Sequence, residues 1–182
     1  MTQNSADRPA QIAIVTVSDR ASRGEYPDKG GPGAEDWLRA TITTPMQITR
    51  VIIPDGREEV AGTLRRLCDQ DGADLILITG GTGPAPRDLT PEAMADVMEK
   101  ELPGFGEEMR RASLAEVPTA ILSRQTAGIR GRTLMITIPG KPSAIATCLN
   151  AVFAAVPYCL DLIGAARIDT DPRRIKAFRP GG

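Results

Sequence analysis

The segment of residues 75–91 constrains the fold of this chain more than any other stretch. It begins with an apolar run at residues 75–79, which is typical of a strand buried on both faces of a sheet. A glycine turn at residues 80–83 follows directly, and Thr90-Pro91 then begins a helix. This order predicts an α/β protein, in which ligands bind at the carboxyl ends of the strands.

The glycine turn has the chemistry of a phosphate site. Glycines leave backbone N–H groups bare, so that an anion can sit against them. Asp88 adds a carboxylate beside the turn, and a carboxylate next to bound phosphates usually shares a divalent cation with them. Pro84 after Gly83 excludes a Walker loop, and the third glycine of a dinucleotide fingerprint is missing. A tight turn without a ligand is the alternative interpretation.

Apolar periodicity predicts a mostly parallel sheet with helices on both faces and one antiparallel strand at an edge. Strands are expected at residues 12–18, 46–53, 75–79, 120–123 and 134–138, with residues 128–131 joining the last two. Helices are expected at residues 34–42, 60–68 and 90–98, from residue 105, and from the turn after residue 138 to residue 163. The interpretation is one domain at residues 11–165, with tails at 1–10 and 166–182.

Composition excludes several classes of function. The net charge of −1 and the aromatic content of 3% argue against a nucleic-acid-binding protein, which needs a basic surface or exposed rings. The chain has no histidine, so that Ser-His-Asp and Cys-His mechanisms and His-ligated metal sites are excluded. Acid–base chemistry would fall to Asp, Glu, Lys, Tyr or Cys side chains.

Cysteine usage and the N-terminus indicate a cytoplasmic protein without membrane contact. Cys68, Cys148 and Cys159 are odd in number and lie among apolar residues, which favours reduced core thiols over a redox or metal set. The first nine residues are polar and lack the apolar core of a signal peptide. We expect no run that approaches the ~18 apolar residues of a membrane span.

Polar or glycine-rich turns follow four predicted strands: Ser18-Asp19, Pro54-Asp55-Gly56, Gly80 to Asp88, and Pro139 to Ser143. If these strands are parallel, the four turns lie at one edge of the sheet, and Asp55 and Asp88 face one cleft. Each residue also has an ordinary alternative. Asp55 could cap its turn, Lys141 could be a solvated charge, and Ser143 could cap the next helix.

Basic residues near these turns are candidates for binding a polyanion. Arg87 could pair with a phosphate or neutralise Asp88. Arg23, Lys29 and Arg124 add positive charge, with solvated surface positions as the alternative for each.

The motifs together resemble those of the molybdopterin adenylyltransferases, the Mog-type family of molybdenum-cofactor biosynthesis. The signature is Thr79-Gly80-Gly81-Thr82-Gly83-Pro84 followed by Arg87-Asp88-Leu89-Thr90-Pro91. Similar segments occur at residues 16–19, 53–55, 102–107, 119–124, 138–142, 156–159 and 177–180. The resemblance covers about residues 11–180.

The resemblance implies a three-layer α/β sandwich, a homotrimer and a reaction. Molybdopterin and Mg-ATP would give adenylylated molybdopterin and pyrophosphate, with Mg²⁺ as the metal cofactor. The nucleophile would be the terminal phosphate of molybdopterin, which is already anionic and needs no general base. It is left open whether another protein of molybdenum-cofactor biosynthesis hands over the substrate.

The resemblance also assigns site residues. Gly80, Gly81, Thr82 and Gly83 correspond to the nucleotide-phosphate loop, Asp88 to an essential catalytic acid and metal ligand, and Asp55 to a second catalytic acid. The substrate pocket would include Ser18, Asp19, Pro139, Gly140, Lys141 and Ser143. The chain departs from the family pattern at Gly56, where relatives often have Glu, and Glu58 or Glu59 could take that place.

Two rival functions remain at this stage. Proteins of the metal-insertion step share a domain of this type but carry additional domains, for which this chain has no room. A non-catalytic trimeric scaffold that binds pterin or nucleotide, as in gephyrin, is the alternative from a different class, and retention of both Asp55 and Asp88 speaks against it.

Overall fold

The buried apolar runs form a six-stranded sheet in the computed structural model, which describes residues 8–181. The strands lie in the order β2-β1-β3-β6-β5-β4. Their bounds are β1 Ala10–Val17, β2 Met46–Ile53, β3 Leu75–Thr79, β4 Lys100–Glu101, β5 Ala127–Arg130 and β6 Thr133–Ile138. β1, β2, β3 and β6 are parallel, whereas β5 is antiparallel to β6 and to the short outermost strand β4. The predicted, mostly parallel sheet with an antiparallel strand at this side is confirmed.

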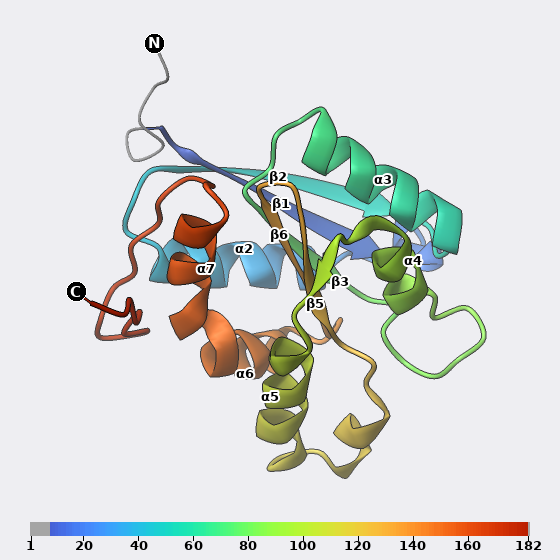
Figure 1. Cartoon of the computed structure of the whole chain (residues 1–182). Helices are drawn as coiled ribbons and strands as arrows, with labels where there is room; N and C mark the ends of the chain where they lie inside the picture. The colour runs from blue at the N-terminus through green and yellow to red at the C-terminus, as the bar shows by residue number, and fades with distance from the viewer. Residues whose placement is uncertain (1–7, 182) are drawn as a thin grey trace.

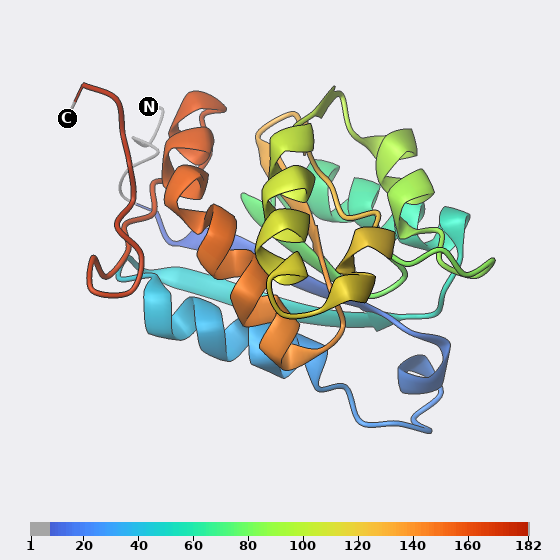
Figure 2. The same ribbon diagram turned by 90° about the horizontal axis from the view of Figure 1, so that it is seen from below.

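Helices cover both faces of the sheet (Figures 1 and 2). α3 and α4 pack together on one face, and α2, α6 and α7 lie on the other, with α5 beside α6. Their bounds are α1 Asp19–Ser22, α2 Gly30–Thr41, α3 Arg57–Asp69, α4 Thr90–Val97, α5 Pro103–Leu114, η1 Pro118–Leu122, α6 Pro142–Val152, η2 Phe153–Ala155 and α7 Val156–Leu162. The three-layer arrangement is therefore confirmed.

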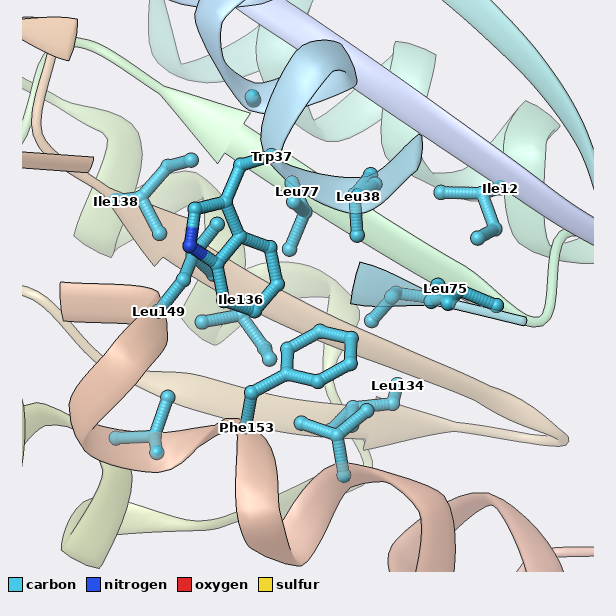
Figure 3. Close-up of a cluster of buried hydrophobic side chains, with 14 of the residues drawn as sticks. Ile12, Trp37, Leu38, Leu75, Leu77, Leu134, Ile136, Ile138, Leu149 and Phe153 are labelled. Carbon is cyan, nitrogen blue, oxygen red and sulfur yellow. The ribbon is translucent and has the colours of Figure 1, made fainter. Parts of the chain in front are cut away.

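Alternating residues of the central strands build two separate cores. Ile12 and Ile14 of β1 pack toward α2 and α6, whereas Ala13 and Val15 pack toward α3 and α4. In the first core the rings of Trp37 and of Phe153 in η2 meet edge to face at 4.8 Å between centroids (Figure 3). Burial on both faces explains why the central strands are continuous apolar runs.

Two elements near the antiparallel strand differ from the expectation. The predicted strand at residues 120–123 is wrong, because residues 118–122 form the 3-10 helix η1. Its apolar side chains do not enter the core, since Ile121 is 66% and Leu122 is 53% exposed. The predicted connection at residues 128–131 is instead largely strand β5, where a Cβ on Gly128 would lie 2.6 Å from the sulfur of Met98. The close approach requires glycine within a strand.

Two helix starts also differ. α2 begins at Gly30 rather than residue 34, because the Asp28 carboxylate accepts a hydrogen bond from the Gly31 N–H (3.0 Å) and stabilises the first turn. Thr90 is the first residue of α4 rather than its side-chain cap, and its hydroxyl donates to the carbonyl of Gly80 (2.9 Å). Tertiary hydrogen bonds therefore decide both starts.

The helical stretch Pro142–Leu162 is long and apolar enough to cross a membrane by length and composition, contrary to the expectation for apolar runs. In this fold it is divided into α6, η2 and α7. Its apolar side chains contribute to the first core, including Ile145, Leu149 and Phe153. The stretch is therefore part of the core of the domain.

The amino end of β3 is joined to the start of β1 and to the segment after α7 through Asp74, which is 1% exposed. Its carboxylate accepts hydrogen bonds from the N–H groups of Gln11 (2.8 Å) and Ala166 (2.9 Å) and from both terminal nitrogens of Arg8 (2.8 and 2.5 Å). Ile168, beyond α7, is also buried in the first core. Of the tails expected at residues 1–10 and 166–182, residues 1–7 and 182 lie outside the described residues.

The three cysteines are unpaired, as expected for reduced core thiols. Cys148 is buried, and Cys68 and Cys159 are half-buried. Burial raises the pKa of the Cys68 thiol to about 11 and also raises the pKa of Cys159. Because burial disfavours the thiolate, these thiols are poor nucleophiles at neutral pH.

Candidate functional site

The site lies where the sheet order changes direction. β1 has β2 on one side and β3 on the other, so that the loops after β1 and β3 diverge at their carboxyl ends and leave a crevice. A cavity of about 610 Å³, here called the main cavity, opens there. Its walls come from the segments that follow β1, β3 and β6, and include Ser18, Arg20, Tyr26, Asp28, Lys29, Gly80, Arg87, Gly140 and Lys141.

The turn after β3 requires glycine at its first two positions. Gly80 and Gly81 have φ angles of 103° and 63°, in the region that favours glycine. A Cβ atom would lie 2.3 Å from the Val17 carbonyl oxygen at Gly80, and 2.3 Å from the Thr90 hydroxyl at Gly81. Within residues 8–181, the N–H groups of Gly81, Thr82 and Gly83 donate to no protein acceptor. The turn therefore offers free donors for an anion.

A second cavity of about 150 Å³ brings the predicted acids together. This acidic cavity is lined by Asp19, Asp55 and Asp88, together with Arg20 and Arg87 and with Val17, Ser18 and Gly81. The acids come from the loops after three different strands, β1, β2 and β3. The expectation that Asp55 and Asp88 face one cleft therefore agrees with their positions.

Asp19 and Asp55 fix each other's loops. The Asp19 N–H donates to Asp55 Oδ2 (2.9 Å), and the Asp55 N–H donates to Asp19 Oδ1 (3.1 Å). Each carboxylate thus accepts, through one of its oxygens, a hydrogen bond from the backbone N–H of the other residue, as in a capped turn. The Ser18 hydroxyl accepts from the Ala21 N–H (3.3 Å) and caps α1. These bonds hold the two acids at the edge of the acidic cavity.

Asp88 closes the loop that follows the glycine turn. Its Oδ2 accepts a hydrogen bond from the Ala85 N–H (3.0 Å). The same oxygen lies 2.7 Å from where a Cβ on Gly83 would stand, so that a side chain at Gly83 would displace the carboxylate. Glycine at residue 83 therefore leaves room for the Asp88 carboxylate in this position.

The donor set at the acidic cavity fits a magnesium ion that is shared with a phosphate. Within residues 8–181, no three acidic, cysteine or histidine side chains are placed to hold a metal on their own. Mg²⁺ prefers carboxylate oxygens, commonly takes only one or two of them, and completes its shell with water and substrate phosphate. Asp55 and Asp88 beside the free N–H groups of the turn meet that requirement.

Basic and aromatic side chains surround the main cavity. Arg20, Lys29, Arg87 and Lys141 line it, and Tyr26 is 43% exposed. The Arg20 guanidinium lies 5.3 Å, and the Lys29 ammonium 6.0 Å, from the centre of the Tyr26 ring, within the range of cation–π contacts. Sequence reasoning missed Arg20 and Tyr26. Their place in the segment between β1 and α2 was the available signal.

The other predicted residues are divided between cavities. Thr82, Gly83, Pro139 and Lys141 line a third cavity of about 420 Å³ on the far side of the glycine turn, so that Lys141 borders both large cavities. Ser143 is exposed in the first turn of α6 and lines none of the three cavities.

The position of Arg124 differs from both interpretations made from the sequence, a charge that binds a polyanion and a solvated surface charge. Its Nε donates to the Gly83 carbonyl (3.0 Å) and its Nη2 to the Asp88 carbonyl (2.5 Å). The guanidinium also forms an ion pair with Glu92 of α4, and this hydrogen bond lowers the pKa of Glu92. Arg124 is therefore bound to the loop that carries Asp88, and is neither a freely solvated charge nor a ligand-facing one.

Residues 13–158 match the family model described as "Probable molybdopterin binding domain". The chain belongs to this molybdopterin-binding family. Its relatives in the family include the molybdopterin adenylyltransferase of Helicobacter pylori strain J99, which is 48% identical over 169 residues that cover 93% of this chain and 96% of the relative. The molybdopterin adenylyltransferase of Escherichia coli K12 is 45% identical, and the match covers 93% of each chain.

Solved structures of the family have the same fold. The molybdopterin biosynthesis enzyme MoaB of Thermus thermophilus superposes with a TM-score of 0.78 at 39% identity, covering 86% of this chain and 98% of that chain. The molybdopterin biosynthesis Mog protein of Mycobacterium ulcerans gives a TM-score of 0.78 at 34% identity, covering 85% and 99%. The fold and family expected from the sequence motifs are thereby confirmed.

Proposed function

We propose that this chain is a molybdopterin adenylyltransferase, which transfers AMP from Mg-ATP to the terminal phosphate of molybdopterin and releases pyrophosphate in molybdenum-cofactor biosynthesis. The observation that carries the proposal is the acidic cavity, where Asp55 and Asp88 meet beside a glycine turn with free N–H groups. Relatives that are 48% and 45% identical bear the name of this activity. The assignment makes the chain a nucleotidyltransferase.

The glycine turn would bind the phosphates of ATP. The free N–H groups of Gly81, Thr82 and Gly83 are donors for phosphate oxygens, and Gly80 allows the backbone to turn toward the main cavity. Arg20 and Arg87 border both the main and the acidic cavity, so that their charges would offset those of the phosphate chain. Binding by backbone and cations together would fix the α-phosphorus for in-line attack.

Asp55 and Asp88 would hold the magnesium ion, with phosphate oxygens and water as the remaining ligands. When bound, Mg²⁺ would supply charge neutralisation for the triphosphate. The protein contributes the placement of the two carboxylates. Asp55 is fixed through Asp19, and Asp88 through the Ala85 N–H.

The reaction needs no general base from the protein. An oxygen of the terminal phosphate of molybdopterin forms a bond to the α-phosphorus of ATP, and the bond from that phosphorus to the bridging oxygen of pyrophosphate breaks. The attacking oxygen is already anionic at neutral pH, so that no proton has to be removed. This chemistry suits a chain without histidine, since catalysis rests on positioning and charge neutralisation.

Molybdopterin would bind from the side of the β1 and β6 loops. The residues proposed to contact it are Ser18, Asp19, Pro139, Gly140, Lys141 and Ser143. Lys141 borders both large cavities, so that its ammonium would reach a phosphate bound in either one. Relatives often have Glu at the position of Gly56, and Glu58 or Glu59 is proposed to take the role of that acid in this chain.

We also propose a homotrimer in the cytoplasm. Large apolar side chains are exposed at Val117, Ile121, Leu122 and Phe178, and such surfaces commonly mark protein interfaces. Light scattering should give three times the 19.4 kDa mass of one chain. A monomeric mass would contradict the proposed assembly without affecting the assignment of the activity.

The test of the function is molybdopterin-dependent release of pyrophosphate from Mg-ATP. The variants are Asp88→Asn and Asp55→Asn, with Asp69→Asn as the matched control, because Asp69 is an exposed ion-paired acid at the far end of α3. The parent and the Asp69 variant should turn over equally, and the two site variants should lose roughly 100-fold or more while remaining folded.

Each contrary outcome has a distinct meaning. A parent that binds ATP but releases no pyrophosphate with intact molybdopterin would leave the non-catalytic scaffold as the function. Normal turnover by Asp88→Asn would remove that residue from the reaction and keep the activity. Delivery of the substrate by another protein of the pathway would appear as faster turnover with a donor extract than with free molybdopterin.

A further inference from the structure

We propose that Arg124 is a positioning residue that holds the glycine turn and Asp88 in their productive geometry. This inference rests on the proposed function, and deepens it. Arg124 lies on the segment between η1 and β5, outside the loops after β1, β2 and β3 that form the site, and would support the site from there.

The contacts of Arg124 span the loop from one end to the other. Its backbone N–H donates to the Thr82 carbonyl (2.8 Å), its Nε to the Gly83 carbonyl (3.0 Å) and its Nη2 to the Asp88 carbonyl (2.5 Å). Residues 83 and 88 are thus held by two nitrogens of one planar group. Because that group is rigid, it fixes the separation of the turn from the acid.

An ion pair orients the guanidinium itself. Nη1 and Nη2 of Arg124 both contact the carboxylate of Glu92, which lies in the first turn of α4. The loop and the helix that follows it therefore share one anchor. Most of its donors are used on protein acceptors, which favours a positioning role for Arg124 over that of a phosphate ligand.

The segment that carries Arg124 is itself held from α5. Arg110 Nη1 donates to the Gln125 carbonyl (2.8 Å) and to the Ser123 carbonyl (3.4 Å), and the Ser123 hydroxyl donates to the side-chain oxygen of Gln125 (2.8 Å). The backbone on both sides of Arg124 is fixed by these bonds. Support for the loop therefore runs from α5 through residues 123–125 to the turn.

A lysine at this position would keep the positive charge. It would lose the set of guanidinium contacts to the Gly83 and Asp88 carbonyls and to Glu92, here called the brace. One ammonium cannot reproduce the planar fork that contacts two carbonyls and a carboxylate together. Since misplacement of a reacting group by about 1 Å can cost about 100-fold in rate, we expect Arg124→Lys to lower kcat at least about 10-fold. The KM for ATP should change less than about threefold, because the N–H groups that bind phosphate remain.

The experiment compares Arg124→Lys and Glu92→Gln with Arg111→Lys. Arg111 is the matched control, an arginine on α5 that pairs with Glu108 at the surface and is 73% exposed. Turnover is measured as kcat and KM for ATP, and melting temperature reports on the whole fold. Hydrogen–deuterium exchange of the hydrogen-bonded N–H groups of Ala85 and Asp88 reports on the loop without any need for activity.

The expected result is a loss in kcat for Arg124→Lys, a smaller loss for Glu92→Gln, and no change for Arg111→Lys. The double variant Arg124→Lys with Glu92→Gln should lose no more kcat than Arg124→Lys alone, because both residues act through the same set of contacts. Exchange of the Ala85 and Asp88 N–H groups, which are hydrogen-bonded within the loop, should rise at least about 10-fold in Arg124→Lys, with melting within a few degrees of the parent.

Three results would overturn the proposal. A raised KM with unchanged kcat would make Arg124 a direct ligand contact. A loss of activity that follows a large fall in melting temperature would make its role structural. Unchanged exchange of the Ala85 and Asp88 N–H groups would show that the loop does not depend on Arg124. A parent without turnover would refute the proposed function, and exchange would still decide whether Arg124 holds the loop.

Discussion

Replacing Asp74 by Ala is expected to destabilise this fold more than any other single carboxylate change described above. Asp74 is buried at the amino end of β3, where its oxygens accept from two backbone N–H groups and from Arg8. An alanine leaves the N–H groups of Gln11 and Ala166 without an acceptor in a closed environment, where water cannot readily replace the carboxylate.

The size of the effect follows from two kinds of contact, the two backbone hydrogen bonds and the ion pair with Arg8. Each stranded N–H group costs about 1–2 kcal/mol. The ion pair adds about 0.5–1 kcal/mol, because the Arg8 side chain is 27% exposed and can return to water. The total loss of about 2.5–5 kcal/mol corresponds to a fall in melting temperature of about 5–20 °C for a chain of this length.

Urea titration of the parent, Asp74→Ala, Asp74→Asn and Arg8→Ala would measure these contributions. We expect Asp74→Asn to lose about 2 kcal/mol, since one acceptor oxygen remains, and Arg8→Ala about 1 kcal/mol. The slope of unfolding free energy against urea should stay constant. Turnover of the folded protein should also stay constant, since the glycine turn lies at the opposite end of β3.

Two results would refute this reasoning. A loss below about 1 kcal/mol in Asp74→Ala would mean that the two N–H groups find other partners or water. An equal loss in Arg8→Ala would assign the stability to the ion pair rather than to the backbone hydrogen bonds.

Three further outcomes are expected. Gly81→Ala should lower turnover roughly 100-fold, because its Cβ would meet the Thr90 hydroxyl, whereas Gly24→Ala, which has a positive φ but no neighbour within 4 Å, should stay within about twofold. Tyr26→Ala should raise the KM of either ATP or molybdopterin about 5–10-fold, whereas Tyr26→Phe should leave both KM values unchanged, because stacking of a substrate ring on the Tyr26 ring needs no hydroxyl. Steady-state kinetics with each substrate varied in turn would measure both values. Cys68 should resist iodoacetamide at pH 8 and label as pH approaches its pKa of about 11. Because the folded pKa is raised by burial, its contribution to stability is present below the ordinary pKa of 9.0 and is lost as pH rises from there through about 11. Rapid labelling of the native protein at pH 8, equal KM values for Tyr26→Ala and the parent, or parent-like turnover by Gly81→Ala would contradict these expectations.

The central sheet was predictable because its signal is local. Burial on both faces makes β3 and β6 continuous apolar runs that need no knowledge of their neighbours. The run at residues 120–123 has the same local character, yet its side chains are exposed in η1. Its conformation depends on packing beside α5, which periodicity does not reveal.

The acids of the site were predictable for a related reason. Asp55 and Asp88 follow parallel strands, and parallel strands bring their carboxyl ends to one edge. The contacts of Arg124 were not predictable in this way, because its partner Gly83 lies 41 residues away and no repeat or spacing marks the pair. The start of α2 was missed likewise, since glycine is a poor helix former and Asp28 stabilises that turn from outside the helix.

The position of Arg124 in the chain has a consequence for biosynthesis. The glycine turn, Asp55 and Asp88 all emerge from the ribosome before Arg124, and β3 acquires its second neighbour only with β6. A nascent chain that ends before Arg124 would hold the acids and the turn but not the brace or the completed sheet. Ribosome-bound fragments of increasing length would therefore gain ordered nucleotide binding only after the segment from residue 123 to Lys141 has been released, late in translation.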